Sequence, residues 1–161
     1  MASGLPQGIG LGTISGLDLS GGGDGTRANV VGRARLSHGD RSFNRWFNTG
    51  AFAMPNIPYQ DGSGKWIIDP GNAPVFPVRG PGQNNWDITL MKKFPLWSEA
   101  RSLQFRAELY NAWNHTQFSG VDTFALFDDT TAGNPQVNGE FGQVVSTRQP
   151  RVIQLSVRLD F

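Results

Sequence analysis

The residues best suited to chemistry are scattered along this chain. His38 and His115 are its two histidines, and no HExxH-like spacing joins either of them to a carboxylate, as a zinc hydrolase requires. The serines fall in no G-x-S-x-G turn, and the absence of cysteine removes thiolate ligands and cysteine nucleophiles. The sequence therefore predicts that the protein is not an enzyme and has no catalytic residue, metal site or cofactor.

Two further stretches have groups that could hold an ion. Asp128, Asp129 and Asn134 could offer oxygens to Ca²⁺, but their spacing differs from that of an EF-hand loop, and a solvated loop is the favoured interpretation. The run GGGDG at 21–25 lacks the Lys-Ser/Thr pair of a phosphate-binding loop, so we predict a flexible turn there.

The stretch RSFNRWFNTGAF at 41–52 combines aromatic and basic residues and is a candidate ligand-binding site. Aromatic rings beside a guanidinium can stack on a sugar or a peptide, and they can equally pack against one another within a loop. Packing within the loop is the favoured alternative. The candidate ligand-binding residues are Arg45, Trp46, Phe47 and Phe52.

The composition favours an all-β protein with long loops. Glycine (21) and proline (10) are frequent among the 161 residues, whereas only 17% of the residues are charged. Gly, Asn, Thr, Val and Phe stand where helical proteins have Ala, Glu and Lys. The formal net charge of +1 argues against a nucleic-acid partner, because such proteins usually carry a basic surplus.

The two parts of the chain differ in pattern. Residues 1–85 are interrupted by turn-forming residues about every ten positions, and only Ile9–Leu19 alternates enough to predict a weak strand. We expect a strand end and a long loop region over 1–85, and antiparallel strands over 86–161. No apolar run is long enough for a transmembrane helix, and the first ten residues lack the basic and apolar regions of a signal peptide.

Three segments of the second part, 86–94, 101–109 and 151–161, hold a period of two between apolar and polar residues. A period of two predicts strands with one apolar and one polar face. The polar face carries Arg106, Glu108 and Arg158. The apolar face carries Ile88, Leu90, Leu103, Phe105, Leu109, Ile153, Leu155, Val157 and Leu159.

The middle segment has a second interpretation. Phe105, Leu109 and Trp113 recur at helical spacing, but the strict alternation matches that of the neighbouring segments and favours a strand. The link Pro95–Ala100 is short, so the strands on either side of it are expected to form an antiparallel hairpin.

An apolar strand face can meet a second sheet in a soluble sandwich, or lipid in an outer-membrane barrel whose polar face lines the lumen. The segments are about nine to eleven residues long, which is the length of a tilted membrane-crossing strand. Trp86, Phe94 and Trp113 stand at segment ends, where barrels place aromatic girdles. Phe161 ends an alternating strand and resembles the terminal aromatic by which the barrel-assembly machinery recognises bacterial outer-membrane proteins.

Four blocks carry a more specific pattern: RSFNRWFNTGAFAMP (41–55), RGPGQNNWDITLMKKF (79–94), LQFRAELYNAWNHTQF (103–118) and FGQVVSTRQPRVIQLSVRLDF (141–161). In this order and spacing they resemble the C-terminal end of TonB-dependent outer-membrane receptors of the Oar-like type. Such receptors are abundant in acidobacteria and carry a carboxypeptidase-regulatory-like domain at the N-terminus. The resemblance covers nearly the whole chain.

The resemblance implies an antiparallel up-and-down meander of about four strands, forming part of a transmembrane β-barrel with long extracellular loops. Barrels of this family have roughly twenty or more strands, and even the smallest barrels need about eight. We therefore expect a C-terminal fragment of a receptor that imports a large nutrient across the bacterial outer membrane, not transport-competent alone. The periplasmic C-terminus of such barrels makes 95–101 a periplasmic turn, and 20–85 and 114–149 extracellular loops.

The expected partners are membrane lipid, the barrel-assembly machinery, and the rest of the receptor barrel or other copies of the chain. Arg106, Glu108 and Arg158 are then lumen-facing, and we favour a cross-strand charge ladder over a substrate path for them. Two alternatives stay open: a small soluble β-sandwich that binds carbohydrate or peptide, and a structural protein whose open sheet edges pair between copies.

Overall fold

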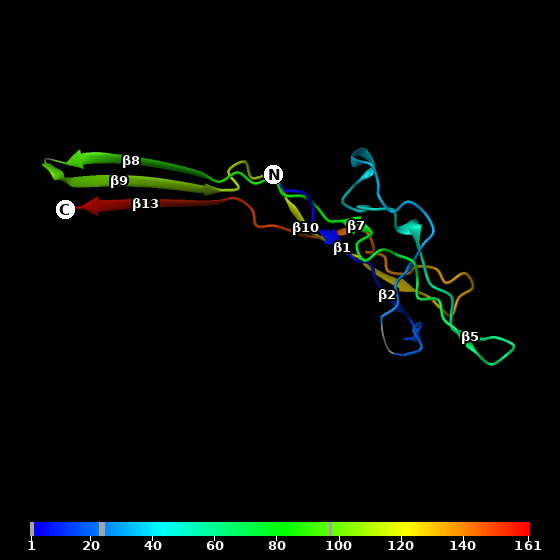
Figure 1. Cartoon of the computed structure of the whole chain (residues 1–161). Helices are drawn as coiled ribbons and strands as arrows, with labels where there is room; N and C mark the ends of the chain where they lie inside the picture. The colour runs from blue at the N-terminus through cyan, green and yellow to red at the C-terminus, as the bar shows by residue number, and fades with distance from the viewer. Residues whose placement is uncertain (1, 23–24, 97) are drawn as a thin grey trace. The chain divides into compact units, whose positions relative to one another are not determined.

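The structure is a computed structural model that describes residues 2–22, 25–96 and 98–161, and it is all-β, as the sequence predicts (Figure 1). Two 3₁₀ turns accompany the strands: η1 (His38–Asp40) and η2 (Thr49–Ala51). The strands are β1 (Pro6–Gln7), β2 (Gly10–Thr13), β3 (Asn29–Val30), β4 (Phe52–Ala53), β5 (Tyr59–Gln60), β6 (Trp66–Ile67), β7 (Val78–Arg79), β8 (Ile88–Leu96), β9 (Ser98–Tyr110), β10 (Phe118–Val121), β11 (Phe124–Phe127), β12 (Val144–Thr147) and β13 (Val152–Asp160).

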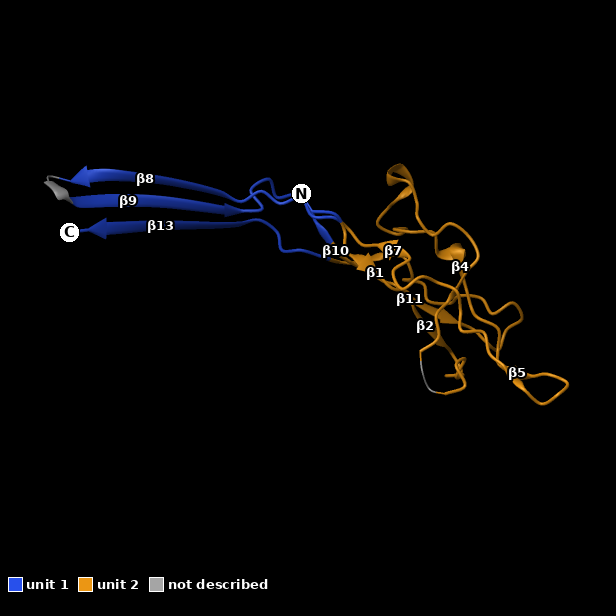
Figure 2. Cartoon of the chain, in the orientation of Figure 1, with its two compact units in different colours: residues 1–3, 82–118, 147–161 blue, residues 4–81, 119–146 orange. Residues whose placement is uncertain are grey.

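The chain divides into two compact units (Figure 2). The first, called the strand unit below, comprises residues 1–3, 82–118 and 147–161, and it contains the three long strands. The second, called the loop unit, comprises residues 4–81 and 119–146. Both units are discontinuous in sequence, whereas the division expected at residue 85 separates two continuous stretches.

The strand unit is built on one antiparallel sheet with the strand order β13-β9-β8. The three alternating segments of the sequence form these strands, and the helical alternative for 101–113 is wrong, because β9 is extended throughout. In Figure 1 the C-terminus lies at the same end of this sheet as the connection between β8 and β9. Strands β8 and β13 therefore run in the same direction, and β9 runs against both.

The connection between β8 and β9 is shorter than the link expected over Pro95–Ala100. Strand β8 continues to Leu96 and β9 begins at Ser98, and these two residues are paired. Proline is tolerated at edge strands and bulges, and the register shifts between Pro95 and Leu96. Trp97 lies outside the described residues.

The loop unit contains short strand pairs, among them a parallel pair of β2 with β11. The strand expected over Ile9–Leu19 is limited to Gly10–Thr13, because the chain turns at Gly16, whose φ is +72°. The ring of Phe124 on β11 lies against Gly10 and Gly12, where a Cβ atom would stand only 2.9 and 2.8 Å from it. The glycines that weaken this strand intrinsically thus make room for an aromatic ring.

Three phenylalanines form the aromatic core of the loop unit. The rings of Phe47, Phe52 and Phe141 meet edge to face, with centroids 5.2–6.1 Å apart, and all three are buried. Phe141 belongs to the 114–149 stretch, in which the structure places β10, β11 and β12. The turn expected at 21–25 includes positions 23 and 24, which lie outside the described residues.

Among the described residues, no helix has both the length and the apolar character needed to cross a bilayer.

Candidate membrane-facing sheet

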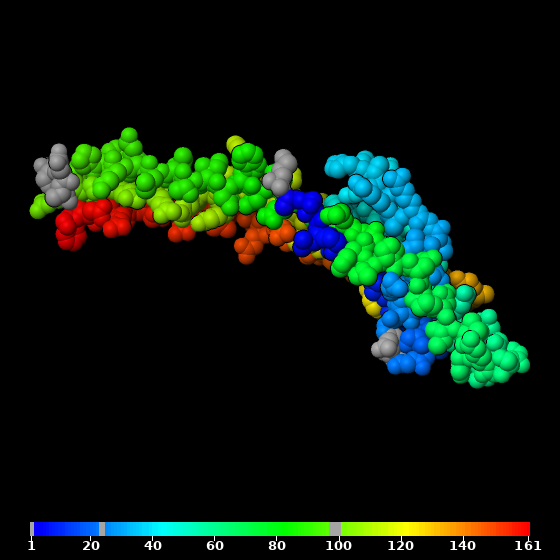
Figure 3. All heavy atoms as spheres, viewed as in Figure 1, coloured from blue at the N-terminus to red at the C-terminus, as the bar shows by residue number. Residues whose placement is uncertain are grey.

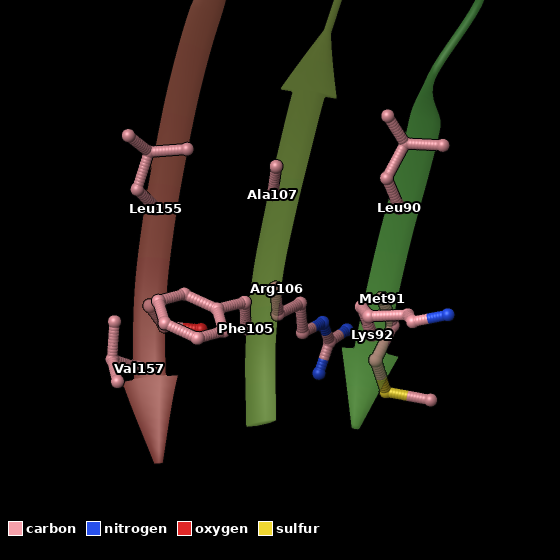
Figure 4. A pocket seen from close by; sticks show the side chains of 9 residues that line it. Leu90, Met91, Lys92, Phe105, Arg106, Ala107, Leu155 and Val157 are labelled. Carbon is pink, nitrogen blue, oxygen red and sulfur yellow. The ribbon is translucent and has the colours of Figure 1, made fainter. Parts of the chain in front are cut away.

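The sheet of the strand unit separates apolar and polar side chains onto opposite faces. Successive residues of a strand point to opposite faces, and paired residues of neighbouring strands share a face. Leu90, Ala107 and Leu155 therefore form one row across β8, β9 and β13, which Figure 4 shows together on the same side. The other apolar rows are Ile88–Leu109–Ile153 and Phe94–Leu103–Leu159. The pair Phe105–Val157 lies between the row of Leu90 and the row of Phe94.

The apolar face is open to its surroundings. Leu155 is 75% exposed, and Leu90 and Val157 are each 63% exposed. Side chains of β8, β9 and β13 lie at the surface in the space-filling view (Figure 3). Such a row of large exposed apolar side chains marks a surface that meets another protein or a membrane.

The opposite face of the sheet is polar and charged. Its rows are Thr89–Glu108–Gln154, Met91–Arg106–Ser156, Lys93–Gln104–Arg158 and Pro95–Ser102–Asp160. The lumen-facing candidates Arg106, Glu108 and Arg158 all lie on it, opposite to the apolar rows.

The ion pairs on the polar face run mainly along strands, not across them as a charge ladder would. Arg106 pairs with Glu108 two residues further along β9, and Arg158 Nε lies 2.7 Å from Asp160 Oδ1 on β13. One longer contact crosses the sheet, between Lys93 Nζ and Asp160 Oδ2 at 3.9 Å. The expected ladder is therefore wrong in its partners, because alternation places the nearest opposite charge two residues away on the same strand.

Met91 and Lys92 depart from the separation of the faces. Met91 lies on the polar face, where Gln104 Nε2 donates to its sulfur at 3.1 Å. Lys92 lies on the apolar face, in register with Phe105, and its ammonium stands 5.8 Å from the centroid of the Phe94 ring. Lys92 lies two residues from both Leu90 and Phe94, and this spacing could have predicted from the sequence that its side chain lies on the apolar face.

A polar network closes the end of the sheet away from the β8–β9 connection. Asp87 Oδ1 accepts hydrogen bonds from the backbone N–H of Asn111 at 3.0 Å and from Asn85 Nδ2 at 2.8 Å. Gln117 is buried and donates to Asn85 Oδ1 at 3.1 Å. These residues, with Tyr110 and Arg148, line a hollow of about 260 Å³. The composition alone gave no signal for this network.

The candidate ligand-binding residues of the loop unit divide into two kinds. Phe47 and Phe52 are 2% and 5% exposed, as expected from the packing alternative. Trp46 is half-buried and its Nε1 donates to the carbonyl of Arg79 at 2.9 Å, while Arg45 is exposed. Among these four, Arg45 and Trp46 are therefore the residues that can reach a ligand without rearrangement of the core.

Carboxylates of the loop unit are held by the hydrogen bonds of their own loops. The backbone N–H of Asn56 donates to Asp69 at 3.0 Å and, with Asn29 and the backbone of Gly71, lowers the pKa of that carboxyl below its usual value of 3.8. Asp128, a candidate Ca²⁺ ligand, accepts from the hydroxyls of Thr130 and Thr131, which lower its pKa as well. Its oxygens are thus already used within the loop.

Phe161 follows the last residue of β13 and is 95% exposed. A fully exposed ring is accessible to a binding partner, and its expected role as an assembly signal stays a prediction.

Comparison with known proteins gives one match. A family model described as an outer membrane beta barrel domain matches residues 1–154. No curated protein and no solved structure matches the chain. The matched residues include all of β8 and β9 and the first three residues of β13, and Leu155, Val157 and Leu159 lie beyond the match.

Proposed function

The chain belongs to the outer membrane beta barrel domain family, and we propose that its three-stranded sheet is a section of the barrel wall of a TonB-dependent receptor. The family makes the protein an outer-membrane barrel protein. In the proposed role the whole receptor binds a large nutrient at the cell surface and imports it. The proposed function is binding and transport, without a catalytic step.

The observation that carries this proposal is the opposition of the two faces of one sheet. One face is formed by apolar side chains that are mostly exposed, with Leu155 at 75%, and the other carries the ion-paired Arg106 and Arg158. A barrel wall needs this arrangement, because its outer face contacts hydrocarbon and its inner face contacts a hydrated lumen.

The open edges of the sheet support a longer receptor. In the described part of the chain, β8 and β13 each have β9 as their one neighbour, so their outer edges carry unpaired backbone groups. Unpaired backbone groups in lipid cost several kcal/mol each, and closure takes about eight strands at least. We therefore propose that the remaining strands of the receptor, or other copies of the chain, complete the barrel with the help of the barrel-assembly machinery.

The loop unit supplies the proposed contact with the nutrient. In barrels the long loops lie outside the cell and the short turns in the periplasm. The connection between β8 and β9 is short, and the loop unit comprises residues 4–81 and 119–146. Arg45 and Trp46 are the proposed contact residues, because Arg45 is exposed and Trp46 is half-buried, whereas Phe47 and Phe52 are buried.

The soluble sandwich is the less favoured alternative. A sandwich buries its apolar strand face under a second sheet. Among the described residues of the strand unit, no second sheet covers Leu90, Leu155 or Val157.

A peptide epitope inserted after Ser63, in the exposed turn between β5 and β6, tests this proposal at the native locus. We expect the tagged protein in the outer-membrane fraction, longer than 161 residues, accessible to antibody on intact cells, and cross-linked to TonB when the cells are energised. The matched control carries the epitope in the β8–β9 connection and should bind antibody only after the outer membrane is permeabilised. A tagged protein in the soluble fraction, or no TonB adduct in energised cells, would contradict the proposal.

A further inference from the structure

Lys92 lies on the apolar face of the sheet, toward the β8–β9 connection, and alternation along β9 puts a second basic residue, Arg101, on the same face. Lys92 alternates with Leu90 and Phe94 on β8, and Arg101 stands two residues before Leu103 on β9. Both are exposed. The described side chains of this face, over 88–96, 101–109 and 153–159, include no carboxylate.

Two aromatic rings lie beside Lys92 on this face, those of Phe94 and Phe105. Its ammonium lies 5.8 Å from the ring centroid of Phe94, which is two residues nearer to the connection. The Phe94 ring in turn meets the Phe105 ring edge to face at 5.9 Å. Lys92, Phe94, Arg101 and Phe105 are called the basic–aromatic cluster below.

The adjacent Lys93 shows what is unusual about Lys92. Lys93 points to the polar face and has a carboxylate within reach, at 3.9 Å from Asp160. Lys92 has no ion-pair partner among the described residues, and the neighbouring side chains on this face, those of Leu90, Phe94 and Phe105, are apolar.

A membrane gives this cluster a defined position. A lysine at the centre of the lipid-facing surface is strongly destabilising, but near the interface the penalty becomes small, because the long side chain lies along apolar surface and its ammonium reaches the headgroups. Aromatic rings gather at the same level. The cluster therefore marks the membrane interface at the end of the sheet that carries the β8–β9 connection.

We propose that Lys92 and Arg101 bind the phosphate of an anionic phospholipid headgroup, with Phe94 and Phe105 packing against the first carbons of its chains. The inference rests on the proposed function, since it requires the apolar face to contact lipid. A short turn marks the periplasmic side of a barrel. The ligand is accordingly a phospholipid of the periplasmic leaflet. Charge complementarity selects it, because the described side chains of this face include two cations and no carboxylate, and such cations favour a phosphate.

The test compares vesicle binding of three variants of the full chain: Lys92→Gln, Arg101→Gln and the control Lys93→Gln. All three remove one positive charge, but Lys93 lies on the other face. Partition into vesicles of phosphatidylcholine, with and without phosphatidylglycerol, is measured by flotation. We expect Lys92→Gln and Arg101→Gln each to lower the preference for phosphatidylglycerol about fivefold. Lys93→Gln should leave it unchanged, and Lys92→Arg should retain it.

A second measurement separates failure of this inference from failure of the proposed function. The chain has no cysteine, so Leu155→Cys carries a single nitroxide label in each variant. Suppose that the label is accessible to oxygen dissolved in lipid, and that Lys92→Gln and Lys93→Gln change the preference for phosphatidylglycerol equally or not at all. The proposed headgroup site is then wrong, whereas the lipid-facing sheet is supported. If the label does not reach lipid in the unsubstituted chain, both proposals are wrong.

Discussion

Leu155 of β13 lies directly across from Ala107 of β9, and the small alanine leaves the leucine standing out from the apolar face with 75% of its surface exposed. Its chain neighbour Ser156 points to the opposite face, in register with Arg106. Adjacent positions on one strand thus have different surroundings, so they can be compared directly.

Leu155→Arg is expected to lower the free energy of unfolding in a bilayer by about 2–4 kcal/mol, because it places a guanidinium in hydrocarbon at mid-depth. Gln154→Arg, on the hydrated face and in register with Glu108, is expected to stay within about 0.5 kcal/mol. Denaturant unfolding of the protein in vesicles measures both. Equal effects of the two substitutions would contradict the assignment of the faces.

The alternation of the sequence was enough to predict the long strands and both of their faces. The alternation of side chains between two faces follows from the extended backbone alone, so it holds in β8, β9 and β13 whatever packs against them. The same alternation places Lys92 on the apolar face, because Lys92 lies two residues from both Leu90 and Phe94. The strand ends were predicted less well, since Pro95 suggested a link where the structure has a bulged strand.

The fold of the loop unit could not be predicted from such patterns, because its contacts join residues far apart in sequence. The pairing of β2 with β11 depends on how the Phe124 ring fits over Gly10 and Gly12. The burial of Phe47 depends on Phe141, and no local signal in either segment indicates the other. Ring packing and ligand stacking also use the same residue types, so the sequence left both interpretations open for Phe47.

Phe141→Ala is expected to destabilise the loop unit by about 3–5 kcal/mol, because it removes a buried ring that meets Phe47 and Phe52 edge to face. Phe76→Ala provides the control, since Phe76 is largely exposed. Limited proteolysis of the loop unit against denaturant concentration reports the difference. Comparable resistance of the two variants would show that the aromatic cluster does not hold the unit together.

Gly71→Ala is expected to disrupt the loop unit through its backbone. Gly71 has a φ of +71°, and a Cβ atom there would lie 1.7 Å from the carbonyl oxygen of Arg27, so both the conformation and the space require glycine. Gly62→Ala is the matched control, because its φ is ordinary and nothing lies within 4 Å of its Cβ. Near-ultraviolet circular dichroism should change for the first variant alone, and an unchanged spectrum for Gly71→Ala would contradict this packing.

Asp69 is expected to make the loop unit sensitive to acid. The backbone N–H of Asn56, followed by Asn29 and Gly71, lowers the pKa of Asp69 below 3.8. The carboxylate therefore contributes its stabilisation fully above that value, and the contribution is lost as the pH falls through the lowered pKa. Asp69→Asn should be less stable than the unsubstituted protein at neutral pH and should lose less stability on acidification. Parallel stability curves for the two proteins, followed by proteolysis, would exclude this role for Asp69.

In the proposed barrel wall, one face of the β8–β9–β13 sheet contacts lipid and the other contacts water. Because the chain has no cysteine, single cysteines at each position from 153 to 159 can carry a nitroxide label, whose collisions with oxygen and with a water-soluble nickel complex are measured in vesicles. We expect strict alternation along β13: labels at Ile153, Leu155, Val157 and Leu159 collide with oxygen, and labels at the positions between them collide with nickel. Low accessibility to both reagents at Leu155 and Val157, as in the core of a compact soluble protein, would contradict it.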